Sequence, residues 1–151
     1  MSIEVKHTIL SFLFLFAVVY MNNNIVKEFG YDSTVSLFST PFVEEFFRFI
    51  SFLIGGPIIF IFTSVMAFLE FFMYIIKVAV TYSGNGFLAY TFMRFLCLLS
   101  HFVFFGIQYK FYKISLKKRN KNYLYGGLLF AYIAHTFWNG YLAVEIYKII
   151  K

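Results

Sequence analysis

Five long apolar runs, separated by short polar stretches, dominate the pattern of this chain. They cover about residues 8–24, 35–55, 58–82, 87–113 and 123–148. The runs are too long for strands and lack sustained alternation, and a backbone in hydrocarbon must satisfy its polar groups internally. The pattern therefore predicts an all-α fold. We expect a polytopic bundle of about five transmembrane helices that forms a single domain over residues 1–151.

Glycine and proline mark the predicted ends of two of these runs. Gly55, Gly56 and Pro57 close the second run, and the turn at residues 83–86 closes the third. Pro41 lies within the second run, where proline removes a backbone donor and disfavours a continuous helix. We expect it to break that run, so that the helix begins near residues 40–41.

Composition narrows the class of protein. Hydrophobic residues make up 61% of the 151 residues and charged residues only 13%, whereas soluble domains carry about 25% charged residues. This balance excludes a disordered chain, a basic nucleic-acid-binding domain and an ordinary soluble enzyme. The remaining class is an integral, multi-pass membrane protein whose partner is the lipid bilayer and which binds no nucleic acid.

The positive charges predict an orientation in that bilayer. The net charge is +6, and six cations lie within twelve residues around the loop that joins the fourth and fifth runs: Lys110, Lys113, Lys117, Lys118, Arg119 and Lys121. Basic loops stay in the cytoplasm. Five spans then place the N-terminus in the cytoplasm and the C-terminus outside, and Lys6 agrees with this orientation. Such a loop is also suited to acidic lipid headgroups.

The apolar runs contain several ionisable residues. They are Glu44, Glu45, Arg48, Glu70, Arg94, His101 and His135. A charged side chain at the centre of a bilayer costs about 2.5–3.5 kcal/mol on insertion scales. These groups must therefore face one another or a wet cavity. Counting inward from the ends of the runs places the glutamates and the two histidines at nearly the same depth, which predicts one polar layer.

Helical spacing suggests how these residues pair. Glu44 and Arg48 are four residues apart, so we expect them to form an ion pair on one helix face. His135 and Asn139 share a face at the same spacing, and Arg94 and His101 share one at a spacing of seven. A salt-bridge network that only holds helices together is the structural alternative, most of all for the two arginines.

Four short motifs carry a resemblance to a known superfamily. Residues 40–48, Thr-Pro-Phe-Val-Glu-Glu-Phe-Phe-Arg, resemble the first motif of the glutamic intramembrane proteases. This superfamily includes the CAAX prenyl proteases, the bacteriocin-processing (CPBP or Abi) proteins and the PrsW proteases. The Glu-Glu-x-x-basic spacing is that of PrsW. Residues 66–74 resemble the second motif, residues 94–101 the third, and residues 135–139 the closing His-x-x-x-Asn. The likeness covers about residues 38–142.

This resemblance implies a reaction. It implies hydrolysis of peptide bonds in membrane-anchored proteins or peptides, in the cell membrane of a prokaryote, by a glutamate-activated water. Two adjacent carboxylates in a low dielectric do not both ionise easily, so one is suited to accept a proton from water. The implied roles are a base from Glu44 or Glu45, water orientation by Glu70 and His101, oxyanion stabilisation by His135 and Asn139, and support from Arg48 and Arg94.

Three alternatives stay open. Chains of glutamate and histidine inside membranes also form proton relays, so a proton-coupled transporter is possible, although no inverted repeat is present. A non-catalytic Abi-like membrane protein would keep the motifs without the activity. Histidine and glutamate also suit zinc, but the His-Glu-x-x-His motif is missing. We therefore assign no metal and no cofactor from the sequence.

Overall fold

The computed structural model describes residues 2–30, 33–81 and 83–150, without the side chains of Tyr147 and Ile150. The described chain is all helical, which confirms the predicted fold class. The elements are α1 (Ile3–Phe29), α2 (Thr34–Ile54), α3 (Ile58–Thr81), α4 (Gly84–Lys118), α5 (Asn122–Phe137), the π-helical turn η1 (Trp138–Leu142) and α6 (Ala143–Ile150). The last three elements follow one another without a break.

Helix α2 continues through Pro41, so the predicted break at this residue is wrong. Pro41 is buried, and the helix begins seven residues earlier, at Thr34, with Ser33 as its N-cap. The Ser33 hydroxyl accepts a hydrogen bond from the backbone N–H of Ser36 at 3.0 Å. One turn later the Thr40 hydroxyl donates to the Ser36 carbonyl at 2.9 Å. Packing by neighbouring helices and bonds from hydroxyl side chains let a buried helix tolerate a proline.

Helix α4 is longer than the apolar run that predicts it. It extends to Lys118, so most of the expected basic loop is helical and the turn itself is confined to residues 119–121. Arg119 ends the helix in the left-handed conformation, with φ of 52°. Lys117 and Lys118 occupy the last turn, where cations interact favourably with the exposed carbonyls and the helix dipole.

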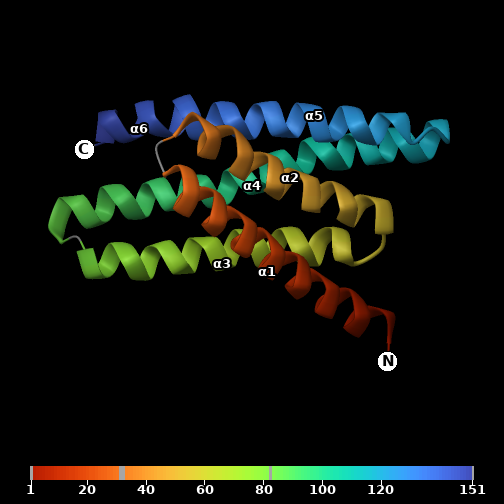
Figure 1. Cartoon of the computed structure of the whole chain (residues 1–151), viewed down its shortest axis with the longest axis horizontal. Coiled ribbons are helices and arrows are strands. Elements are labelled where there is room, and N and C mark those ends of the chain that lie inside the picture. The colour runs from red at the N-terminus through yellow and green to blue at the C-terminus, as the bar shows by residue number, and fades with distance from the viewer. Residues whose placement is uncertain (1, 31–32, 82, 151) are drawn as a thin grey trace.

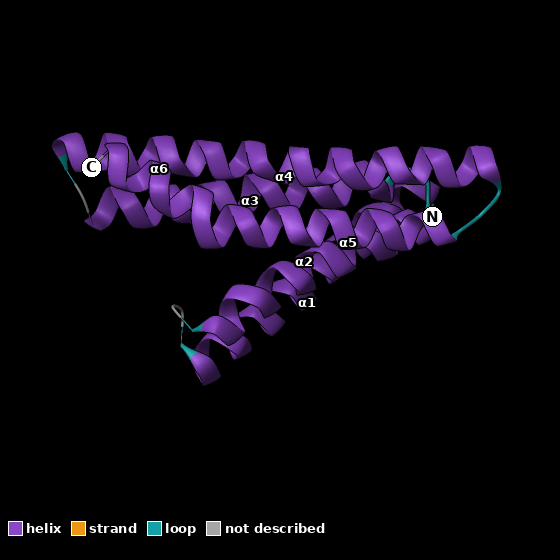
Figure 2. Ribbon diagram, turned by 90° about the horizontal axis from the view of Figure 1, so that it is seen from above, coloured by secondary structure: helices purple, strands orange, loops and turns teal. Residues whose placement is uncertain are grey.

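The helices form a bundle in which α4 is central. It packs most extensively against α5 and next against α3, while α1 packs on α2 and α3, and α2 also contacts α5. Figure 1 shows the N-terminus and the α4–α5 turn at the same end of the molecule, with the C-terminus at the opposite end. In Figure 2, α1 and α2 diverge together from the layer formed by α3, α4 and α5.

Two apolar clusters flank the charged part of α2. One joins α1, α2 and α3 and consists of Leu15, Val18, Val43, Ile58, Phe62 and Met66. The other joins α2, α3 and α5 and consists of Phe49, Phe52, Ile59 and Leu124, with aromatic rings of α4 packed against it. Glu45 and Arg48 lie between Val43 and Phe49 along α2. The ion pair is therefore enclosed on both sides by hydrocarbon.

Three of the described helices, α1, α3 and α4, are long and apolar enough to cross a membrane, which indicates a membrane protein. Helix α2 is of similar length but carries Glu44, Glu45 and Arg48, and α5 alone has only 16 residues before the π-helical turn. The two helices that are too polar or too short to qualify, α2 and α5, thus contribute Glu44, Glu45, Arg48 and His135, which are most of the ionisable residues predicted for the polar layer.

Close packing of α4 on α5 leads to a prediction about two glycines. A Cβ atom at Gly127 would lie 2.9 Å from Phe111 Cβ and 3.4 Å from Gln108 Cα, whereas one at Gly106 would meet nothing within 4 Å. We expect Gly127→Ala to lower the free energy of unfolding by about 1–3 kcal/mol. Gly106→Ala, the matched control, should leave it unchanged or raise it by up to about 1 kcal/mol. Denaturant titrations of the detergent-solubilised protein, followed by circular dichroism, measure both. Equal stability of the two variants would contradict this packing.

Candidate functional site

The centre of the candidate site is a buried ion pair between Glu45 and Arg48. Both side chains have no exposed surface, and Arg48 Nη1 donates to both carboxylate oxygens of Glu45. The predicted partner of Arg48 was Glu44, and that prediction is wrong. Residues three and four positions apart are both neighbours on a helix. Here Glu45 and Arg48 turn together toward α4 and α5, whereas Glu44 lies between Asn22 of α1 and His135 of α5.

Two further side chains complete the surroundings of Glu45. Gln108 Nε2 donates to Glu45 Oε2 at 2.9 Å and to the Glu45 carbonyl at 3.2 Å. His135 Nδ1 lies 2.8 Å from Glu45 Oε1. A carboxylate offers about four lone-pair sites, and the four side-chain contacts from Arg48, Gln108 and His135 use them. Glu45 has no oxygen left with which to activate a water molecule.

Glu44 differs from its neighbour in having one free oxygen. Asn22 Nδ2 donates to Glu44 Oε1 at 3.0 Å. The other oxygen, Oε2, is buried without a hydrogen-bond partner and lies 3.7 Å from His135 Nε2. Because a carboxylate only accepts, His135 Nδ1 donates to Glu45. In the neutral tautomer the ring then presents a lone pair at Nε2 to Glu44 Oε2, and a water molecule or a cation between these two acceptors would satisfy both.

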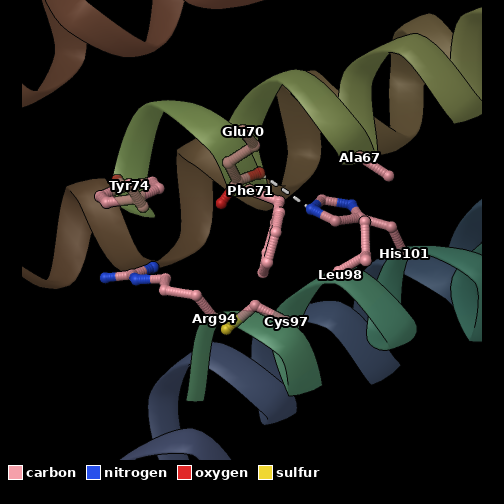
Figure 3. A pocket seen from close by; sticks show the side chains of 8 residues that line it. All are labelled: Ala67, Glu70, Phe71, Tyr74, Arg94, Cys97, Leu98 and His101. Atoms are coloured by element: carbon pink, nitrogen blue, oxygen red, sulfur yellow. Dashed lines mark hydrogen bonds and ion pairs between the residues drawn. The ribbon is translucent and has the colours of Figure 1, made fainter. Parts of the chain in front are cut away.

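Glu70 and His101 form the second half of the site. His101 Nε2 lies 2.8 Å from Glu70 Oε2, a contact drawn as a dashed line in Figure 3. On the other side of the ring, His101 Nδ1 lies 3.5 Å from Arg48 Nη2. Arginine can only donate, so His101 Nδ1 accepts from Arg48 and His101 Nε2–H donates a hydrogen bond to Glu70. Arg48 thereby connects the two halves.

A narrow crevice opens beside this pair. Arg94 and His101 both line it, as their spacing of seven predicts, and the Arg94 guanidinium lies 3.7 Å from the centroid of the Tyr74 ring. Figure 3 shows the guanidinium directed to Tyr74, with the Phe71 ring between Arg94 and His101. This cation–π contact holds the Arg94 guanidinium at the rim of the site rather than in its centre.

Aromatic rings fix the orientation of the two histidines. The Phe104 ring stacks on His135 with centroids 4.4 Å apart, and the His101 and His135 rings meet edge to face at 5.7 Å. His101 and His135 are almost completely buried. The glutamates and histidines that the sequence places at one depth are thus brought together from α2, α3, α4 and α5.

Asn139 is not brought into this cluster. It is exposed and lies in η1, and within the described part of the chain no hydrogen bond joins it to the glutamates or histidines. The prediction that it shares a face with His135 assumes a continuous α-helix. The π-helical turn beginning at Trp138 has more residues per turn, which changes the direction of the side chains that follow.

Two polar residues of the site were missed in the sequence. Gln108 follows His101 by seven residues, as His101 follows Arg94, so the heptad on α4 was a usable signal. Asn22 lies near the end of the first predicted run, 8–24, where no site residue was expected, and α1 continues beyond it to Phe29. No family model, curated protein or solved structure matches this chain. The functional argument therefore depends on the residues of the site.

The buried pair leads to a prediction about stability. Arg48→Leu leaves the Glu45 charge buried without its partner, which should lower the free energy of unfolding by about 3–5 kcal/mol. Replacing both residues by leucine should recover most of that loss, because no unpaired charge then remains. Lys77→Leu, at an exposed position of α3, is the control and should change stability by less than about 0.5 kcal/mol. A double variant less stable than Arg48→Leu would contradict this account of the pair.

Proposed function

We propose that this protein is a glutamate-dependent intramembrane endopeptidase of the PrsW and CPBP type. The observation that carries the proposal is the difference between two adjacent carboxylates. Glu45 is saturated by hydrogen bonds, whereas Glu44 Oε2 is buried and unpaired and lies 3.7 Å from His135 Nε2. An unpaired carboxylate oxygen facing an imidazole lone pair is suited to hold a water molecule and take its proton.

The proposed reaction begins with a water molecule between Glu44 and His135. It donates one proton toward Glu44 Oε2 and the other toward His135 Nε2, so its own lone pair is directed at the substrate carbonyl. Glu44 takes the proton as the C–O bond forms, and the tetrahedral intermediate receives the negative charge on its oxygen. The C–N bond then breaks as the leaving amine takes that proton from Glu44.

The other residues would position these groups. Glu45 and Phe104 hold the His135 ring, the first through Nδ1 and the second by stacking. His101 lines the crevice, and because its Nε2–H is bonded to Glu70 Oε2 it positions that carboxylate rather than donating to the oxyanion. This assignment gives His135 the role of positioning the water. Asn139 has no role in it, because its side chain is exposed.

The proposed substrate is a membrane-anchored protein or peptide in the cell membrane of a prokaryote. In the proposed topology the chain crosses the bilayer five times, with the N-terminus and the α4–α5 turn in the cytoplasm. Their position at the same end of the bundle supports this orientation (Figure 1). The cations of α4 and of the turn, Lys110 to Lys121, would then meet the cytoplasmic leaflet.

The topology can be measured by labelling single cysteines in a Cys97→Ser background. With a membrane-impermeant maleimide, Lys118→Cys should react only from the cytoplasmic side and Asn85→Cys, in the first turn of α4, only from the opposite side. The reason is that basic segments resist translocation. Labelling of both positions from one side would contradict a full crossing by α4, and the reverse pattern would overturn the orientation.

Substitution of Glu44 should abolish cleavage without unfolding the protein. Glu44→Gln keeps an oxygen for Asn22 but removes the base, so cleavage should fall by about 10²–10⁴-fold without loss of helical content. Purified protein and a library of single-span substrates, analysed by mass spectrometry, provide the assay. Glu145→Gln, which removes an exposed carboxylate paired with Lys148 at 2.8 Å, is the control and should cleave normally.

Full cleavage by Glu44→Gln would refute the proposed base. If no substrate is cut and the protein instead carries protons across liposomes, the polar cluster serves transport.

A further inference from the structure

We propose that Glu44, Glu70 and His101 form a binding site for a divalent transition-metal cation, of which Zn²⁺ fits the donor set best. One ligand atom from each residue lies within 4.8 Å of the others. The three residues come from α2, α3 and α4, so only the folded bundle unites them. Two carboxylates and an imidazole are typical protein ligands of zinc.

An independent observation points to a missing partner at this position. Glu44 Oε2 is buried and has no hydrogen bond, although a carboxylate oxygen in such surroundings normally has one. His135 Nε2 lies 3.7 Å away and presents a lone pair in the neutral tautomer, while its Nδ1 is held by Glu45 at 2.8 Å. A carboxylate that orients a histidine through its second nitrogen is the usual support of a metal-binding histidine. His135 is not one of the three ligands that lie within 4.8 Å of one another, but it borders the site at Glu44.

The charges of the cluster also favour a cation. Glu44, Glu45 and Glu70 carry three formal negative charges, and Arg48 balances one of them. Arg94 contributes a second positive charge at the rim, stacked on Tyr74. With neutral histidines at least one negative charge stays unbalanced inside an apolar bundle, where an unbalanced charge is costly. A divalent cation bound to Glu44 and Glu70 removes this excess.

Binding requires the metal to take the place of a proton at His101. His101 Nε2–H donates to Glu70 Oε2 at 2.8 Å, and a metal bound to both residues replaces that hydrogen bond. In the neutral ring the proton moves from Nε2 to Nδ1 as the Zn–N bond forms at Nε2, the 3.5 Å contact of Nδ1 with Arg48 is given up, and Zn–O bonds form to the two glutamates. Zn²⁺ uptake should weaken as the pH falls, because protons compete with the metal for the histidine and the carboxylates.

The test is direct measurement of Zn²⁺ binding to the tag-free protein in detergent. After dialysis against Zn²⁺ and removal of excess, we expect about one retained Zn²⁺ per chain, and weaker retention as the pH is lowered. Glu70→Gln and His101→Gln should each weaken binding by about 10–100-fold or more. Glu145→Gln and His7→Gln, which change the same residue types outside the cluster, should bind as the wild type.

Glu70 is about one third exposed, so its substitution should leave the protein folded even if His101→Gln does not. Circular dichroism and gel filtration check this. Retention of less than about 0.1 Zn²⁺ per chain, or equal affinity in wild type and Glu70→Gln, would overturn the site.

A regulatory consequence rests on the proposed function. Zn²⁺ bound to Glu44 Oε2 occupies the lone pair that would accept the proton of the water, so Zn²⁺ should inhibit cleavage and a chelator should restore it. Cleavage lost with chelator and restored by Zn²⁺ would keep the metal site but overturn the glutamate base. Stoichiometric Zn²⁺ binding without any cleavage would support the metal site and would count only against the proposed protease function.

Discussion

The Glu45–Arg48 pair is the interaction on which the arrangement of this bundle depends. Neither charge has contact with water, so each must find its partners within the protein. Glu45 takes its partners from three helices, because Arg48 belongs to α2, Gln108 to α4 and His135 to α5. Arg48 also reaches His101, which in turn bonds to Glu70 on α3. Sliding or rotating any of these helices would leave a charged or polar group unsatisfied in hydrocarbon, and the pair therefore fixes their register.

That constraint separates two residues which look equivalent in sequence. Adjacent positions on an α-helix point about 100° apart, so Glu45 meets Arg48, Gln108 and His135, whereas Glu44 lies between Asn22 of α1 and the far side of the His135 ring. The first is surrounded by donors and its lone pairs are used. The second has a single donor, Asn22, and retains a free oxygen beside His135. The two carboxylates of this dipeptide thus have different surroundings, and removal of one should not mimic removal of the other.

The sequence predicts more of the fold than of the pairing inside it. Long apolar runs and the cost of buried charge suffice to predict five helical segments and one polar layer. They do not determine whether Arg48 pairs with Glu44 or Glu45, because both lie within reach on a helix and the choice depends on the neighbouring helices. Asn139 was misplaced since a π-helical turn has no clear signature in the residues. The extension of α4 was missed because lysines in a last helical turn look like a loop by hydropathy.

The free oxygen of Glu44 connects the two functional ideas. A carboxylate oxygen with no donor, held in a low dielectric beside an imidazole lone pair, attracts any electrophile small enough to enter. A proton taken from water makes Glu44 a base, and a metal ion makes it a ligand. Both uses draw on the same lone pair, so they exclude one another at any moment. The stacking of Phe104 and the bond to Glu45 prevent His135 from turning away to relieve the mismatch. In the proposed function and in the proposed metal site alike, the reaction or binding event would depend on whether a proton donor or a cation enters beside His135.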